Sequence, residues 1–312
     1  MQIPLSKNFT VITLTTEHLG FYLCNLLIPG DPQTVTIRTD SGSWTIDQEH
    51  NFQEVKQEIE INGKVGRTYA ALNDVPIGAY GMSASMDAAF EELLPLCLGA
   101  SYLTGLAVTP HGSTPHSFIT FMQVGDHFPR ARAMNPAAPG IVSVPGSPIT
   151  SNGTTFVSTL EAFMKSYPGT HASEKTRLLV HHWLDALACW SLEDLVLSTA
   201  TMLEIIAATA GGISKAAGTP QNTFNQRIQY AATRFGLSVV SSDFRNMRND
   251  LVHEGTLSAT KFAGKVHSDC TKATAEALNW IDQYLFAALG LGAAPKARFS
   301  ANTFNRLNAF SL

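Results

Sequence analysis

The sequence predicts an α+β protein, with a strand-rich N-terminal domain over residues 1–150 followed by an all-α helical domain over residues 151–312. Two patterns predict strands in the first half and helices in the second. The first half contains β-branched segments with period-2 alternation, whereas the second half places apolar residues three and four positions apart. Between them, residues 129–153 hold five prolines and three glycines, a composition typical of a linker. The length of 312 residues also fits two domains of roughly 150 residues each.

The N-terminal domain is expected to consist mainly of short strands, because β-branched residues recur in the segments 10–15, 34–38, 55–61 and 63–69. Asn62-Gly63 is typical of the tight turn of a β-hairpin, so the last two of these segments should pair with each other. One helix at about 86–103 and a buried strand at 117–124 complete the expected domain.

The C-terminal domain is expected to be helical throughout. Apolar stripes predict helices at 174–190, 192–210, 221–235, 243–254 and 260–289. Gly211-Gly212 and Gly218-Thr219-Pro220 interrupt the pattern where connections are needed. After Gly292 the chain is small and polar with scattered Phe residues, and the sequence leaves open whether this tail packs on its own chain or on a partner.

Composition predicts a soluble, cytoplasmic protein. Hydrophobic residues make up 45% of the chain, which is ample material for packed cores. The four cysteines lie too far apart for metal knuckles and are too few for a disulfide framework, so reduced thiols are expected. The N-terminus shows no secretory signal, and the apolar stretch 195–211 is interrupted by Ser, Thr and Glu204, so no membrane span is expected.

Charge is distributed unevenly along the chain. Residues 1–150 hold 7 Lys and Arg against 13 Asp and Glu, and residues 151–312 hold 14 against 12, within a total net charge of −4. A mildly basic second half is compatible with RNA but excludes a strongly basic, histone-like surface. Any cationic site must therefore be local, or doubled by dimerisation.

The clearest chemistry lies in the segment 248–253, Arg-Asn-Asp-Leu-Val-His. Arginine stays charged at any working pH and binds phosphate oxygens, whereas histidine exchanges protons near neutral pH. An apolar stripe, Asp243 as N-cap and Gly255 as a stop predict that the segment is helical. On an ideal helix Arg248 and His253 lie about 140° apart, so one copy is poorly arranged to act alone. Asn249 and His253 are four residues apart and face each other, so the amide can orient the imidazole.

The spacing Arg-x4-His, with Asn directly after the Arg, resembles the signature of HEPN domains. Its setting, Phe-Arg-Asn-Met-Arg-Asn-Asp-Leu-Val-His-Glu-Gly, is most similar to the HEPN domain of ApeA-like bacterial anti-phage proteins. The resemblance spans about residues 155–290, including a preceding amphipathic helix with Leu203-Glu204 and a following helix around Trp280. It implies a four- or five-helix bundle that forms a homodimer and cleaves RNA without a metal ion or cofactor.

The same resemblance assigns the catalytic roles to Arg248, Asn249 and His253. His253 would take the proton of a ribose 2′-OH or protonate the leaving 5′-oxygen. Arg248 would stabilise the charge that builds on the phosphoryl oxygens, and Asn249 would orient the His253 imidazole. A two-fold dimer would bring two such helices into one cleft. The expected substrate is tRNA or mRNA, and the N-terminal domain would be the sensor or recognition part, responding to a phage trigger.

Several further residues are candidates from the sequence. Arg227 and Arg234, seven apart on a predicted helix, and Arg245 beside the motif could follow RNA phosphates, although two solvated arginines are the preferred interpretation of the first pair. Glu204, among apolar neighbours, is expected to be buried and to need Arg245 or Arg248 as its partner. No metal site is expected, because His181, His182 and Asp185 lack a third ligand in view.

Three other interpretations stay open. Arg, Asn, Asp and His are common on a solvated helix face, so the motif can be purely structural. A HEPN-like module can also dimerise or bind a nucleotide or partner without cutting RNA. In the third alternative, the protein is a toxin whose site is blocked by an antitoxin.

Overall fold

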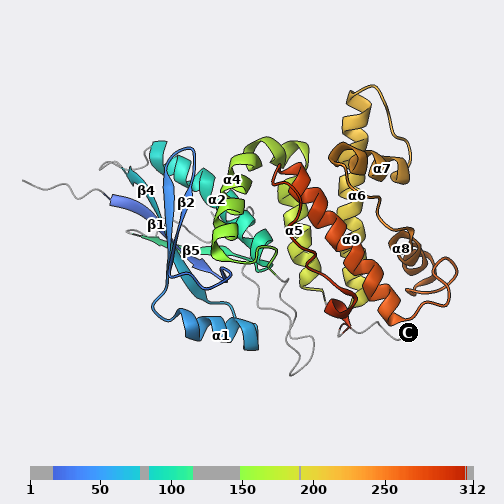
Figure 1. Ribbon diagram of the computed structural model, residues 1–312, viewed down its shortest axis with the longest axis horizontal. Helices are drawn as coiled ribbons and strands as arrows, with labels where there is room; N and C mark the ends of the chain where they lie inside the picture. The colour runs from blue at the N-terminus through green and yellow to red at the C-terminus, as the bar shows by residue number, and fades with distance from the viewer. Residues whose placement is uncertain (1–16, 78–83, 115–147, 190, 306, 308–312) are drawn as a thin grey trace, which may run out of the picture.

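The computed structural model describes residues 17–77, 84–114, 148–189, 191–305 and 307. It confirms the predicted α+β class: an antiparallel five-stranded sheet in the N-terminal half is followed by a mostly helical second half (Figure 1). The expected strands at 10–15 and 117–124 lie outside the described residues, as does most of the expected linker.

The sheet has the strand order β2-β3-β4-β1-β5, and all neighbouring strands are antiparallel. Its members are β1 (Glu17–Cys24), β2 (Thr34–Arg38), β3 (Ser43–Gln48), β4 (Arg67–Ile77) and β5 (Thr109–Thr114). The strand predicted at 34–38 is confirmed, and its alternation buries Val35 and Ile37 on one face. Strand β3 was not expected, although Trp44 and Ile46 alternate in the same way and are buried.

The predicted hairpin at 55–69 is wrong, because residues 52–62 form helix α1 (Phe52–Asn62). Phe52 and Ile59 are seven residues apart, so they share one face of this helix and are buried together. Gly63 has φ 64°, but it ends the helix as a left-handed cap instead of turning a hairpin, and its N–H bonds back to the Ile59 carbonyl at 3.1 Å.

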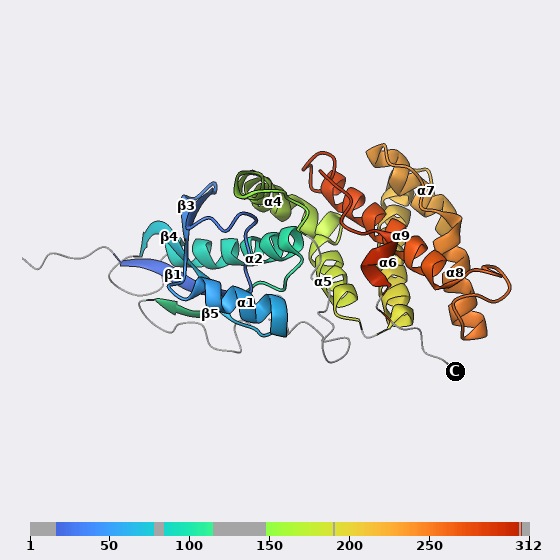
Figure 2. The same cartoon turned by 60° about the horizontal axis from the view of Figure 1, so that its bottom comes forward.

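Helices α2 (Ala84–Thr104) and α4 (Gly153–Ser173) connect the sheet to the helical region (Figure 2). Both helices contact the sheet and α5 (Thr176–Leu187) as well as each other. The helix predicted at 86–103 is confirmed as α2. Helix α4 was not expected; its N-cap Asn152 accepts a 2.9 Å hydrogen bond from the Thr155 N–H, and a stripe of aromatic and aliphatic residues is buried along it.

The remaining helices surround α6 (Leu192–Ala216), which contacts α5, α7 (Phe224–Phe235), α8 (Ser242–Glu254) and α9 (His267–Ala288) (Figure 1). These elements confirm the helices predicted in the second half, except that residues 260–266 belong to a loop and not to α9. Among the described helices, α6 alone is long and apolar enough to cross a membrane. In its most apolar 18-residue window, 44% of the helix is buried inside the structure, where α6 contacts α5, α7, α8 and α9.

A buried polar cluster ties the two halves of the chain together. Arg298, in the tail after α9, places its Nε 3.0 Å from Asp282 Oδ2 of α9, and its guanidinium carbon lies 4.3 Å from the Trp183 ring centroid and 4.6 Å from that of Tyr102. Tyr102 of α2 donates to Asp282 Oδ1 at 3.0 Å. The tail, including the short helix η1 (Ala301–Phe304), therefore packs against its own chain.

Candidate active site

Helix α8 carries the Arg-x4-His segment, as the sequence predicts. Ser241, and not the expected Asp243, is its N-cap, since the Ser241 hydroxyl accepts a 3.2 Å hydrogen bond from the Asp243 N–H. Phe244 and Met247 are buried against the bundle, and Gly255 ends the helix in the left-handed conformation. The helix packs against both α6 and α9, so these two helices fix the direction in which its outer face points.

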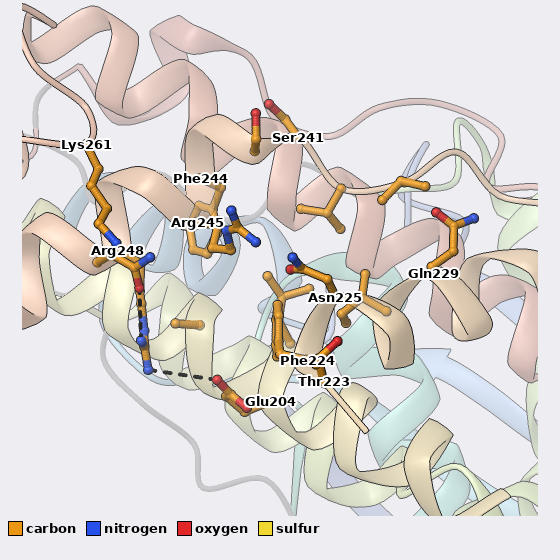
Figure 3. A pocket seen from close by; sticks show the side chains of 17 residues that line it. Glu204, Thr223, Phe224, Asn225, Gln229, Ser241, Phe244, Arg245, Arg248 and Lys261 are labelled. Atoms are coloured by element: carbon orange, nitrogen blue, oxygen red, sulfur yellow. Dashed lines mark hydrogen bonds and ion pairs between the residues drawn. The ribbon is translucent and has the colours of Figure 1, made fainter. Parts of the chain in front are cut away.

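Arg248 and Asn249 line a cavity of about 740 Å³ between α6, α7, α8 and the segment that follows α8 (Figure 3). Apolar side chains form part of its wall, and hydroxyl, amide and charged groups form the rest. The described lining residues are Ala200, Leu203, Glu204, Thr223, Phe224, Asn225, Ile228, Gln229, Val239, Val240, Ser241, Ser242, Phe244, Arg245, Arg248, Asn249 and Lys261. A cavity of this size and mixed character suits a nucleotide-sized ligand.

Arg248 is held loosely from two sides. Its Nη1 donates to Asn249 Oδ1 at 3.3 Å, and its Nη2 lies 3.8 Å from Glu204 Oε1 (Figure 3). The expected pairing of Glu204 with Arg248 is present, but the expected burial is wrong: 56% of the Glu204 side chain is exposed, because this position of α6 faces the cavity. Such an exposed pair is weak, so an incoming phosphate can compete for Arg248.

The cavity is rich in positive charge. Of its described lining residues, Arg245, Arg248 and Lys261 are cationic, whereas Glu204 is the single carboxylate. Within the described part of the chain, neither Arg245 nor Lys261 has an ion-pair partner. Unpaired cations around a hollow attract an anionic ligand.

His253 does not join this group. It lies in the last turn of α8, is exposed, and does not line the cavity. The Asn249 amide oxygen accepts from Arg248, and no hydrogen bond between Asn249 and His253 is present among the described residues. One copy of the chain thus presents the arginine and the histidine on different parts of the helix surface.

Arg227 and Arg234 of α7 are also outside the cavity lining. Arg227 Nε donates to the Gln221 carbonyl at 2.9 Å, which ties the helix to the loop before it. Arg234 Nη2 lies 2.6 Å from Glu174 Oε1, so its guanidinium is engaged in an interhelical ion pair. The residues of α7 that do reach the cavity include Asn225 and Gln229, which sequence reasoning missed (Figure 3).

Lys261 and Asp250 were also missed. Lys261 was assigned to the start of the following helix, whereas it lies in the loop after α8 and extends toward Arg248 (Figure 3). Asp250 is only 1% exposed, although it stands in the middle of a polar segment. Burial raises the pKa of its carboxyl, but hydrogen bonds from the backbone of Lys261, Phe262 and Ala259 outweigh burial and lower that pKa to about 2. A buried Asp inside a helix signals such a partner loop, but the sequence does not identify it.

Over the described residues, no three His, Cys, Asp or Glu side chains converge as a metal site requires. Comparison of the chain with protein-family models, with curated proteins and with solved structures finds no match.

Proposed function

We propose that this protein is an endoribonuclease of the HEPN type that cleaves RNA by attack of a ribose 2′-OH and needs no metal ion. The observation that supports this most is the position of Arg248 at a cavity of nucleotide size beside two further cations, Arg245 and Lys261. His253 is exposed on the same helix and free to meet a substrate at its surface. Together they supply charge stabilisation and an imidazole that can accept or donate a proton.

In the proposed reaction, neutral His253 takes the proton of the 2′-OH, whose oxygen attacks the adjacent phosphorus while the bond to the 5′-oxygen breaks. The protonated imidazole can return a proton to the leaving 5′-oxygen, so the products are a 2′,3′-cyclic phosphate and a 5′-hydroxyl. Arg248 stabilises the charge on the phosphoryl oxygens, and Asn249, bonded to Arg248 at 3.3 Å, fixes the direction of the guanidinium. This differs from the expected role of Asn249, which was to orient the histidine.

A homodimer completes the proposed site. Because Arg248 and His253 point to different parts of the α8 surface, a two-fold axis near α8 would let the arginine of one protomer act with the histidine of the other. The proposed substrates are tRNA or mRNA in the cytoplasm, and the proposed setting is anti-phage defence or a toxin, with the N-terminal half responding to a trigger or an antitoxin.

The test is incubation of the purified protein with total tRNA in EDTA, followed by end-group analysis. Wild type should leave 2′,3′-cyclic phosphate ends, whereas His253→Ala and Arg248→Ala should leave the RNA intact. His267→Ala is the matched control, because His267 is another exposed histidine, at the first residue of α9, and does not line the cavity. Cleavage that persists in His253→Ala, or that stops in EDTA, contradicts the mechanism.

A second function is favoured by one observation, the absence of His253 from the cavity lining. A nucleotide-binding or partner-binding module of the same fold needs the cationic cavity and not the histidine. Such a module would bind RNA or a nucleotide with the same affinity in wild type and His253→Ala, and neither protein would cut RNA. Arg248→Ala would still weaken the binding.

A further inference from the structure

The loop between α8 and α9 is anchored by a carboxylate inside the motif helix. Both carboxylate oxygens of Asp250 accept hydrogen bonds from the Lys261 N–H, at 2.9 and 3.1 Å. Asp250 Oδ2 also accepts from the N–H groups of Ala259 and Phe262, each at 2.8 Å, and Oδ1 accepts from the Thr260 hydroxyl at 3.3 Å. One side chain therefore fixes four consecutive residues of the loop against α8.

The anchoring places a cation at the cavity. The loop backbone is held on the buried side of α8, where Phe262 is 3% exposed, and the neighbouring Lys261 side chain extends from it toward Arg248 (Figure 3). Asp250 and Arg248 are two residues apart on the same helix, so the element that supplies the arginine also sets the position of the lysine. Lys261 is exposed and has no carboxylate partner among the described residues.

We propose that Lys261 is a phosphate-binding residue of the cavity and that Asp250 is the residue that positions it. This inference rests on the proposed function in one respect, that the ligand of the cavity is RNA. Arg248 would hold the phosphate at the reaction centre, and Lys261, entering from a different segment, would hold a neighbouring phosphate of the same strand. The relative positions of these two cations at the cavity would then help to set the path of the RNA.

The experiment measures binding apart from cleavage. A fluorescent single-stranded RNA with 2′-O-methyl groups at every position cannot attack its own phosphates, so its affinity can be followed by anisotropy at several KCl concentrations. Loss of one phosphate contact lowers the slope of log K against log salt by about 0.7 for a single strand. Lys261→Met should show that loss, Lys261→Arg should restore the slope, and Lys265→Met, a charge change in the same loop outside the cavity lining, should leave it unchanged.

Asp250 is tested by a double-mutant cycle. Asp250→Asn should lower the slope as Lys261→Met does, and it should have no further effect on affinity in the Lys261→Met background. Equal losses in the two backgrounds would show that Asp250 acts independently of Lys261, which overturns its role as a positioning residue. Should Asp250→Asn not fold, hydrogen exchange of the wild type decides: the amides of 259, 261 and 262 should be protected, and fast exchange at all three overturns the anchoring.

The outcomes separate this inference from the proposed function. If wild type binds the 2′-O-methyl strand with a Lys261-dependent slope but never cuts unmodified RNA, the nuclease proposal fails and the inference stands. If unmodified RNA is cut in an Arg248-dependent way while Lys261→Met binds with the wild-type slope, the inference fails and the nuclease proposal stands. A wild type that does not bind the strand overturns the inference.

Discussion

Arg234 and Glu174 form an ion pair at 2.6 Å that joins α7 to the end of α4, across 60 residues of sequence. The Tyr284 hydroxyl of α9 donates to the same carboxylate at 2.8 Å, so three helices meet at Glu174. The Glu174 side chain is 8% exposed and that of Arg234 is 23% exposed. An arginine placed in this way stabilises the bundle and is not available to follow RNA phosphates.

Arg234→Ala and Arg245→Ala should therefore affect different properties: the first should lower stability, and the second should weaken RNA binding. Arg234→Ala leaves a buried carboxylate without its cation and should lower the free energy of unfolding by about 3 kcal/mol, the low end for breaking a buried pair because Arg234 is partly exposed. Arg245→Ala, at the cavity, should weaken RNA binding with little change in stability. Urea unfolding and RNA anisotropy distinguish the two, and a stable Arg234→Ala with weakened RNA binding contradicts this assignment.

The Asp282–Arg298 pair should show strong coupling, because its side chains are 2% and 0% exposed. Arg298→Met alone should lower the free energy of unfolding by about 3–5 kcal/mol, since it leaves Asp282 buried without a cation. Replacing both residues, as Asp282→Leu with Arg298→Met, should cost less than the sum of the single changes. Chemical denaturation of the four proteins measures the coupling, and additive losses would contradict it.

Gly99 allows α2 to approach α4 closely. A Cβ at this position would lie 2.6 Å from Leu160 Cδ1 and 2.8 Å from Phe163 Cδ1, both buried. Gly99→Ala should therefore lower the free energy of unfolding by about 1–3 kcal/mol through overpacking. Gly212→Ala is the control, because a Cβ there meets nothing within 4 Å in helix α6, and it should leave stability equal or raise it by up to about 1 kcal/mol. Thermal unfolding of both variants is the measurement.

Glu204 should oppose RNA binding, because its carboxylate lies 3.8 Å from Arg248 and faces the cationic cavity. Glu204→Gln should raise the affinity for the 2′-O-methyl strand about two- to five-fold at low salt, as expected for removal of an exposed charge worth up to about 1 kcal/mol. The gain should shrink at high salt. Glu276→Gln, on the exposed surface of α9, changes the net charge equally and should have a smaller effect. An equal gain in both variants would assign the effect to net charge alone.

Asp250 should make the protein sensitive to acid. The folded-state pKa of about 2 lies below the ordinary value of 3.8, so the carboxylate contributes stability above pH 4. That contribution is lost as pH falls from about 4 to about 2, where the folded protein must take up the proton. Wild type should therefore be more stable than Asp250→Asn at pH 7, and the difference should shrink over this interval. Urea midpoints of the two proteins between pH 2 and pH 7 provide the test.

Periodicity predicted most of the helical half, because the apolar stripes of α5 to α9 face one core. The prediction failed where one sequence motif is compatible with two structures. Asn62-Gly63 is typical of a hairpin turn, yet a left-handed glycine also ends a helix, as Gly63 does in α1. The start of α9 was placed too early because residues 260–266 lack a strong helix breaker before Gly264, and the contacts of Asp250 that hold them as a loop are tertiary.

The candidate site was predicted in part. Arg248 and Asn249 could be identified from their spacing in the motif, since both lie within one helix. Lys261 and Gln229 could not, because their positions at the same cavity depend on how α7 and the loop after α8 pack. The exposure of Glu204 was missed for a related reason: apolar neighbours along α6 suggested burial, but the cavity leaves this side chain open.

The position of Arg298 has a consequence for synthesis on the ribosome. Its guanidinium lies against Tyr102 and Trp183, so the interior of the N-terminal half includes a side chain made almost two hundred residues after Tyr102. A nascent chain cannot close this part of its core until residue 298 has left the exit tunnel. Until then the surroundings of Tyr102, at the end of α2, stay open to chaperones, and a message truncated before that codon yields a protein whose first half is also incomplete.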